Sequence, residues 1–164
     1  MVALTIPNLR AFTTHLFLKE TFDQFLLVEA DIVTFNSFHI DGMINEDFYT
    51  EEEKEQLGVE PFSRWMSIRP ICFSLIRGSK LPLSFKIVFR LSASGTQKLL
   101  TQAGLSDRYD VEALYFNILY KNNALTCITG TSSREFTMDK TVEHIWDEKI
   151  RQFFKKWEID FDQA

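Results

Sequence analysis

The most constraining feature of this sequence is the alternation of apolar and mostly polar side chains over residues 83–92. Leu83, Phe85, Ile87, Phe89 and Leu91 occupy every second position, and four of the five alternate residues over 84–92 are polar. Successive side chains of a β-strand point to opposite faces of its sheet, so this pattern predicts a strand with one buried face. A sheet that is apolar on one face needs a covering layer there.

The end of the chain has the pattern of a long amphipathic helix, which can supply such a layer. Apolar side chains recur after Asp139 at the spacing of a helix face. They are Val142, Ile145, Trp146, Ile150, Phe153, Phe154 and Trp157. A second, shorter helix is predicted after Asn8, whose side chain can cap it.

Further strands are predicted from β-branched and aromatic runs, at 2–6, 26–40 with a turn at Asn36-Ser37, 71–76, 114–120, 125–131 and 135–138. Pro70 suits the first position of a strand, so we expect 71–76 and 83–91 to pair as a hairpin. Asn122-Asn123 is typical of a tight hairpin turn. A short helix capped by Ser94 is predicted before Gly104.

Residues 43–60 are polar and acidic. Thr50 and Glu53 have the spacing of a capping box, which predicts a short helix that Gly58 would end. The order of elements then has two similar parts, each a strand, a short helix and two strands. We predict a single α+β domain over residues 1–164, an antiparallel sheet from two βαββ-like halves (about 1–78 and 79–164) with the long C-terminal helix packed on it.

Location and redox state follow from what the chain contains. Apolar runs do not exceed four residues, against the roughly 18 that a membrane span needs. The start has no basic and apolar segments of a signal peptide. Cys72 and Cys127 are too few for a disulfide framework and are predicted to be small buried residues. We expect a cytoplasmic protein without a membrane partner.

Basic and acidic side chains are unevenly distributed. Residues 1–60 contain 3 Lys or Arg and 12 Asp or Glu, whereas residues 61–106 contain 7 Lys or Arg and neither Asp nor Glu. Such a stretch of cations favours a surface that binds an anion or an acidic partner. The basic residues that we assign to this surface are Arg64, Arg69, Arg77, Lys80, Lys86 and Arg90.

Three interpretations of this charge asymmetry stay open. The acidic stretch 46–60 can neutralise the basic residues within the molecule. The two segments can instead join copies of the chain head to tail, or the basic residues can bind another protein or a polyanion. A protein partner or self-association is favoured over nucleic acid. Lys86 and Arg90 alternate with apolar positions, so both are expected on the exposed sheet face.

Residues with metal-binding chemistry are few. His39 and Asp41 are two apart on a predicted strand and therefore share a face, where Glu29 or Asp31 is the nearest further ligand. We interpret the pair as a solvated strand end. His15 is predicted to pack beside the first helix, and His144 to form surface charge pairs. Nucleophile elbows and phosphate-binding loops do not occur, so we expect no catalytic residues, metal or cofactor.

The 16 phenylalanines predict an aromatic core. Alternatively, some of them line an apolar pocket between the last helix and the sheet, which would hold a small hydrophobic ligand. The residues of this possible pocket are Phe85, Phe89, Phe116, Trp146, Phe153 and Trp157. An exposed Trp65, in its basic neighbourhood, would instead suit a protein interface.

Several segments resemble an uncharacterised family of small proteins from Firmicute bacteria, a domain of unknown function. The segments are 1–4, 21–27, 69–76, 82–89 and 144–147. This resemblance implies a bacterial, clostridial source and carries no activity. In architecture alone, two βαββ halves are also similar to a domain of the DNA sliding clamp, and a helix-grip fold uses the same elements.

Two functional hypotheses follow. The first is a non-catalytic interaction module that binds a macromolecular partner through its basic sheet face. The alternative is a carrier of a small hydrophobic ligand, held under the C-terminal helix. An enzyme is the least favoured class, because the residues that catalysis needs are not grouped in any recognisable motif.

Overall fold

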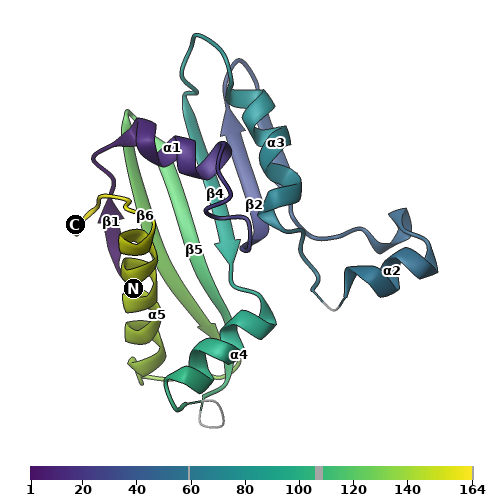
Figure 1. Cartoon of the computed structure of the whole chain (residues 1–164), viewed down its shortest axis with the longest axis vertical. Coiled ribbons are helices and arrows are strands. Elements are labelled where there is room, and N and C mark those ends of the chain that lie inside the picture. Colours follow the sequence, from purple (N-terminus) through teal and green to yellow (C-terminus); the bar gives the residue numbers. More distant parts are fainter. Residues whose placement is uncertain (59, 106–108, 164) are drawn as a thin grey trace.

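A seven-stranded antiparallel sheet with the strand order β3-β2-β4-β5-β6-β1-β7 forms the centre of the structure (Figure 1). The computed structural model describes residues 1–58, 60–105 and 109–163. The strands are β1 (Ala3–Thr5), β2 (Leu26–Val33), β3 (Ser37–Asp41), β4 (Ser84–Arg90), β5 (Val111–Lys121), β6 (Ala124–Ser133) and β7 (Asp162–Gln163). The predicted α+β class is confirmed.

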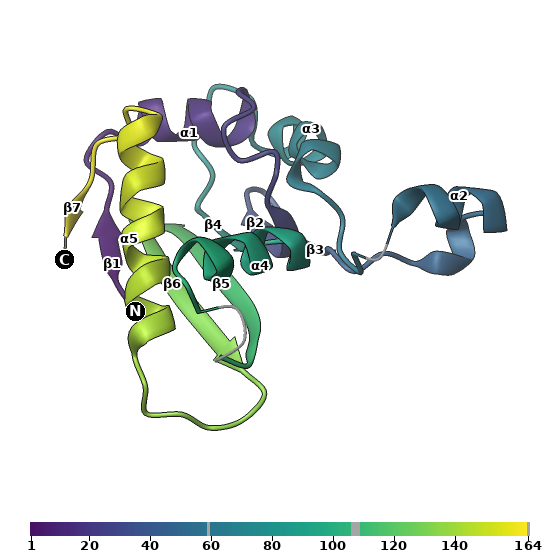
Figure 2. The ribbon, with the colours of Figure 1, turned by 60° about the horizontal axis from the view of Figure 1, so that its bottom comes forward.

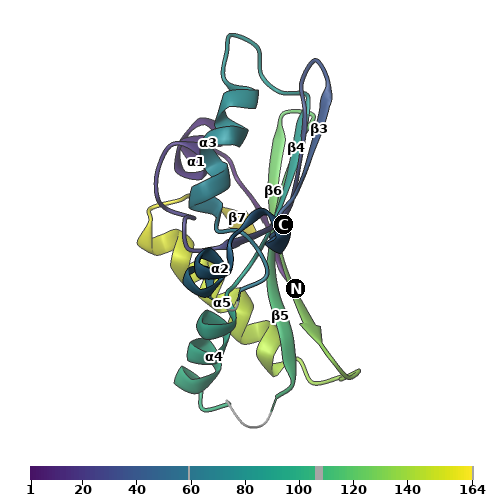
Figure 3. The same cartoon turned by 90° about the vertical axis from the view of Figure 1, so that its right-hand side faces the viewer.

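The helices other than α2 cover one face of this sheet and leave the other open (Figure 3). They are α1 (Leu9–Phe17), α2 (Glu51–Leu57), α3 (Trp65–Ile76), α4 (Ala93–Gln102) and α5 (Thr141–Lys156), with a short 3-10 helix at Glu46–Phe48. The predicted C-terminal helix is α5, which packs against β6. Among the described residues, every helix is too short or too polar to cross a bilayer.

Several local predictions are confirmed by the backbone. In β4, Phe85, Ile87 and Phe89 are buried while Lys86 between them is exposed. Asn122 and Asn123 both have positive φ, 54° and 59°, in the turn between β5 and β6. The Thr50–Glu53 capping box forms with both of its hydrogen bonds, and Gly58 follows α2 with φ 78°. Asn8 caps α1 by accepting from the amide of Ala11.

The predicted strand at 71–76 is wrong, because this segment belongs to helix α3. Trp65, Ile68 and Cys72 bury one side of that helix at spacings of three and four, a period that starts six residues before the predicted strand. Pro70 lies inside the helix instead of opening a strand. It lacks the N–H for one helical hydrogen bond, which α3 tolerates. The hairpin with 83–91 therefore does not form, and β4 pairs with β2 and β5.

Other expectations need smaller corrections. Residues 135–138 lie in a loop, and the last strand is the two-residue β7, which the sequence pattern did not indicate. Ser92 caps α4 in place of Ser94. The two βαββ sets recur as β1-α1-β2-β3 and β4-α4-β5-β6, but they are not equivalent. The second set is inserted between β2 and β1, so β4 and β5 are neighbours whereas β1 and β2 are not.

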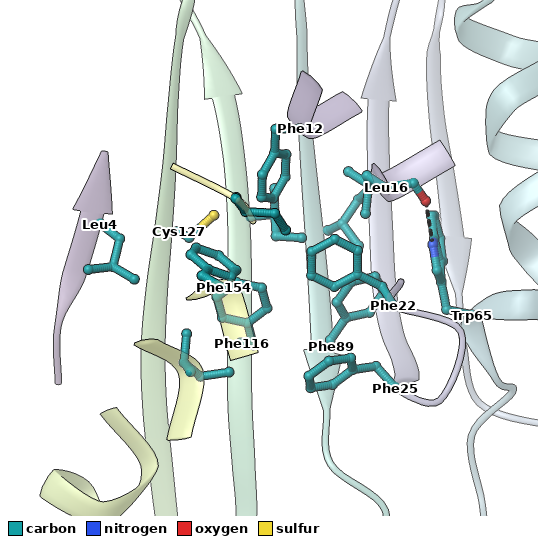
Figure 4. Close-up of a cluster of buried hydrophobic side chains, with 14 of the residues drawn as sticks. Leu4, Phe12, Leu16, Phe22, Phe25, Trp65, Phe89, Phe116, Cys127 and Phe154 are labelled. Atoms are coloured by element: carbon teal, nitrogen blue, oxygen red, sulfur yellow. Dashed lines mark hydrogen bonds between the residues drawn. The ribbon is translucent and has the colours of Figure 1, made fainter. Parts of the chain in front are cut away.

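An aromatic core fills the space between the sheet and its helices (Figure 4). Phe22, from the loop after α1, stacks on Phe89 and Phe116, at ring-centre distances of 5.9 and 6.2 Å. Phe25 stacks on Phe89 at 5.5 Å. Offset and edge-to-face ring pairs of this kind add to the free energy gained by burial. The loop before β2 is therefore part of the core and holds the helix layer in place.

Helix α2 stands away from this core (Figure 2). None of its residues is buried. The two ends of the segment that carries it pair with each other at Met43 and Phe62, and Arg64 pairs with Leu26 of β2. The acidic residues of α2 are thus held apart from the sheet.

Candidate functional site

The six predicted basic residues do not form one surface. Arg69 lies on α3 and makes a bidentate ion pair with Asp23, at 2.9 and 3.0 Å. Lys86 projects from the open sheet face but bonds Glu29 at 3.0 Å. The Arg90 guanidinium lies 5.2 Å from the ring centre of Phe62. The other three flank α3: Arg64 precedes it, and Arg77 and Lys80 follow it. Of the six residues, Lys86 and Arg90 are the two that belong to a strand of the sheet, β4.

Internal neutralisation by the acidic stretch 46–60 does not occur either among the residues described. Glu51 pairs with Lys54 inside α2. Glu60 accepts a hydrogen bond from the backbone amide of Ala93, at the first residue of α4. The carboxylates that neutralise Arg69 and Lys86 are Asp23 and Glu29, which lie outside that stretch.

A small polar cluster lies on the open face at the β2–β3 edge. His39 is paired in register with Asp31, and its Nδ1 lies 2.6 Å from the Asp31 carboxylate. That hydrogen bond raises the pKa of His39. Ligand atoms of Glu29, Asp31 and His39 lie within 4.8 Å of one another, so the three can share a metal ion. In this structure Glu29 forms an ion pair with Lys86, and Asp31 is hydrogen-bonded to His39.

Other candidate residues are buried. Burial raises the pKa of the Cys72 thiol to about 12 and that of Cys127 well above its ordinary value, so neither is poised as a nucleophile. Both are small core residues, as predicted. Trp65 is fully buried, and its indole N–H donates to the Leu16 carbonyl at 2.8 Å. It cannot anchor a partner.

The predicted pocket is split between a filled core and an open groove. Phe85, Phe89 and Phe116 lie deep in the core, where rings from α1 and the following loop fill the space between helix and sheet. Trp146, Phe153 and Trp157 line a groove of about 580 Å³ beside α5. We name it the α4–α5 groove, because its walls come from these two helices and from residues 20–25.

The floor of the α4–α5 groove is apolar and continuous with the core. It is made by Phe25, Leu91, Trp146, Ile150, Phe153 and Trp157. Phe153 meets Phe25 edge to face, with ring centres 5.6 Å apart, and Trp157 lies 6.5 Å beyond it. The Trp146 indole donates to the Tyr115 carbonyl at 2.8 Å, which fixes the ring against the sheet.

The rim of the groove is polar and has a net positive charge. Lys149 and Lys156 on α5 and Lys98 on α4 line it, with Glu20 as its acidic residue. The remaining polar lining comes from Thr21, Gln24 and Gln152. On α5, Trp146, Lys149, Phe153 and Lys156 lie at i, i+3, i+7 and i+10 and so share one face of the helix. The apolar stripe at this spacing predicted the aromatic residues, whereas the lysines beside them carry no signal that places them at a groove.

Comparison with known proteins places the chain in a family. Residues 15–162 match the family described as "Family of unknown function (DUF5721)". The chain belongs to that family. Its DUF5721 region contains every residue of the α4–α5 groove. The predicted resemblance to a domain of unknown function is confirmed at this level. No curated protein and no solved structure matched the chain.

Proposed function

We propose that this DUF5721 protein binds a small apolar ligand in the α4–α5 groove. The observation that carries the proposal is a hollow of about 580 Å³ with a floor of aromatic and aliphatic side chains. Ligand sites in proteins have volumes of roughly 300–1,000 Å³ and are lined mainly by apolar side chains with a few polar groups. The groove has this size, and its six apolar lining residues are accompanied by seven polar or charged ones.

The apolar floor is only partly covered by the protein itself. Trp157 leaves 39% of its surface exposed, and Phe153 is partly exposed. Removing such surface from water is favourable, by about 25 cal/mol for each Å². A ligand seated between α4 and α5 would bury both rings without moving the core beneath them.

The alternative of a basic sheet face has less support. Two of its six residues are held in ion pairs, and Arg69, Arg77 and Lys80 lie on α3 or after it and not on the sheet. The groove, in contrast, contains three of the six residues that were predicted for a pocket. We therefore favour the ligand-binding protein over the macromolecular interaction module.

The proposal is tested with N-phenyl-naphthylamine, a neutral fluorophore that brightens in apolar sites. We expect saturable binding to the purified protein with one site per chain. Gln152→Trp, which places a large ring in the groove wall, should reduce the affinity. The matched control is Gln97→Trp, an exposed α4 position outside the groove, which should bind as the unmodified chain does.

Native mass spectrometry of the purified protein supplies a second readout. A non-covalent adduct that disappears on denaturation, and is absent from Gln152→Trp, would identify a ligand carried through purification. If the fluorophore does not bind, or binds equally to Gln152→Trp and the unmodified chain, the proposed function is wrong.

A further inference from the structure

We infer that the ligand of the α4–α5 groove is an anionic amphiphile, with an acidic head group at the lysine rim and an apolar body on the aromatic floor. This inference rests on the proposed function and specifies its ligand class. The inference is drawn from the charged residues of the groove, whereas the proposed function is drawn from its apolar floor.

Within the described part of the chain, the three lysines of the groove have no carboxylate paired with them, unlike some other cations of the molecule. Arg69, Lys86, Lys54, Lys140 and Arg151 each have a carboxylate partner within 4.0 Å. Lys98, Lys149 and Lys156 have none among the residues that the structure describes, although Lys156 lies 5.8 Å from the ring centre of Trp157. Eight other Lys and Arg among the described residues also lack a carboxylate partner, so what distinguishes the groove is that three such lysines line one apolar hollow.

The arrangement of these three lysines suits a ligand that lies along α5. Lys149 and Lys156 are seven residues apart, about 10 Å along the helix axis at 1.5 Å a residue. Lys98 is on α4, so the positive charge comes from two walls of the groove. Glu20 offsets one of the three charges. A net positive rim beside a low-dielectric floor attracts an anion more strongly than the same charges do on an open surface.

The chemistry of lysine determines which kinds of head group the rim can bind. Lysine ammonium groups are compact point charges with three donors, without the planar fork by which arginine selects a bidentate partner. They donate hydrogen bonds to carboxylate, sulfonate and phosphate oxygens alike. Gln24, Gln152 and Thr21 can add neutral hydrogen bonds. Selectivity is therefore expected for one negative charge on an apolar body, and not for a particular acid.

The test compares two fluorophores with the same ring system, anilinonaphthalene sulfonate and neutral N-phenyl-naphthylamine. Lys149→Glu should weaken binding of the sulfonate by about tenfold at low salt and change binding of the neutral probe by less than about twofold. Lys155→Glu is the matched control, because it makes the same charge change at an exposed position of α5 outside the groove. It should weaken the sulfonate by less than about threefold.

Competition then separates the sources of the anion. Dodecanoate and dodecyl phosphate should each displace the bound sulfonate, whereas inorganic phosphate should not, because it lacks the apolar body. Preference for one of the two dodecyl compounds would assign the head group.

The outcomes distinguish this inference from the proposed function. Failure of the neutral probe to bind overturns the function itself. If the neutral probe binds in the groove, but Lys149→Glu and Lys155→Glu weaken the sulfonate equally, the rim does not select an anion and the inference is wrong. Displacement by inorganic phosphate alone would also overturn it, because the site would then bind a bare anion.

Discussion

Strand β4 shows the difference between the two faces of the sheet. On the helix-covered face, Phe85 and Phe89 contact other rings within 6 Å and exclude water. On the open face, Lys86 keeps 46% of its side chain exposed and is paired with Glu29. Shortening a side chain on the helix-covered face removes contacts that nothing replaces. On the open face, water can replace the contacts of a shortened side chain. The α4–α5 groove lies where the covered face reaches solvent, so it combines an apolar floor with free charges.

The sharpest test of this difference shortens one side chain on each face of β4. Phe89→Ala removes the ring that contacts Phe22, Phe25 and Trp65, and should lower the free energy of unfolding by about 3–5 kcal/mol. Lys86→Ala should lower it by less than about 1 kcal/mol. Urea denaturation followed by circular dichroism measures both. Similar losses for the two variants would show that the open face is covered in solution.

A charged pair on the covered side should have an intermediate effect. Asp23→Ala leaves Arg69 without its bidentate partner in a site where both side chains are less than one-fifth exposed. We expect a loss of about 1–3 kcal/mol in unfolding free energy. Asp110→Ala is the control, because its contact to Arg134 is 3.8 Å long and exposed. An equal effect of both variants would show that the burial of the Arg69 pair contributes nothing.

On the open face, reversing one charge should have a smaller effect that a second reversal corrects. Lys86→Glu faces Glu29 and the in-register Asp31, so we expect a loss of about 1 kcal/mol at low salt. Adding Glu29→Lys restores the pair and should recover most of that loss. Thermal melts at low and high salt measure the cycle. If the double variant is no more stable than Lys86→Glu alone, the Lys86–Glu29 contact is not an energetic pair.

The covered face was the predictable part of the fold, because burial leaves a period in the sequence. The alternation in 83–91 predicted β4, and the spacing of Trp146, Ile150 and Phe153 predicted α5. The segment 71–76 failed for a physical reason. Its apolar run is too short to separate a strand from a helix by period, and Pro70 at its start favoured the strand. The helical spacing becomes visible only from Trp65.

The candidate site was predictable only in part. The aromatic residues of α5 were identified, since they belong to a periodic apolar stripe. The positions of Phe22 and Phe25 under α5 were not predictable. They lie in a loop, and a loop has no period that shows where its side chains point. Lys98 lines the same groove as the α5 lysines only because α4 packs beside α5. The pairing of Arg69 with Asp23 likewise depends on tertiary contacts between residues 46 apart in sequence.

The two faces should also differ in how pH changes their stability, and His15 and His39 report this. Burial, with Lys19 nearby, lowers the pKa of His15 below 6.5. Below pH 6.5 the His15 ring therefore binds more protons in the unfolded chain than in the folded one. Its contribution lowers the stability of the fold as pH falls. The hydrogen bond to Asp31 raises the pKa of His39 above 6.5. The stabilisation that His39 contributes is fully present below pH 6.5 and is lost as pH rises through the pKa of His39 in the folded chain.

The two contributions are separable by replacing one histidine at a time. In His39→Gln, the remaining dependence from His15 should make the melting temperature rise between about pH 5.5 and 7. In His15→Gln, the melting temperature should fall as pH rises above about 6.5. NMR titration of the two rings in the unmodified chain gives the pKa values directly. Asp31→Asn is the control, because it should return the pKa of His39 toward 6.5 and leave that of His15 unchanged. A His39 pKa at or below 6.5 in the unmodified chain would contradict the pairing on the open face, and with it the view that charges there satisfy one another.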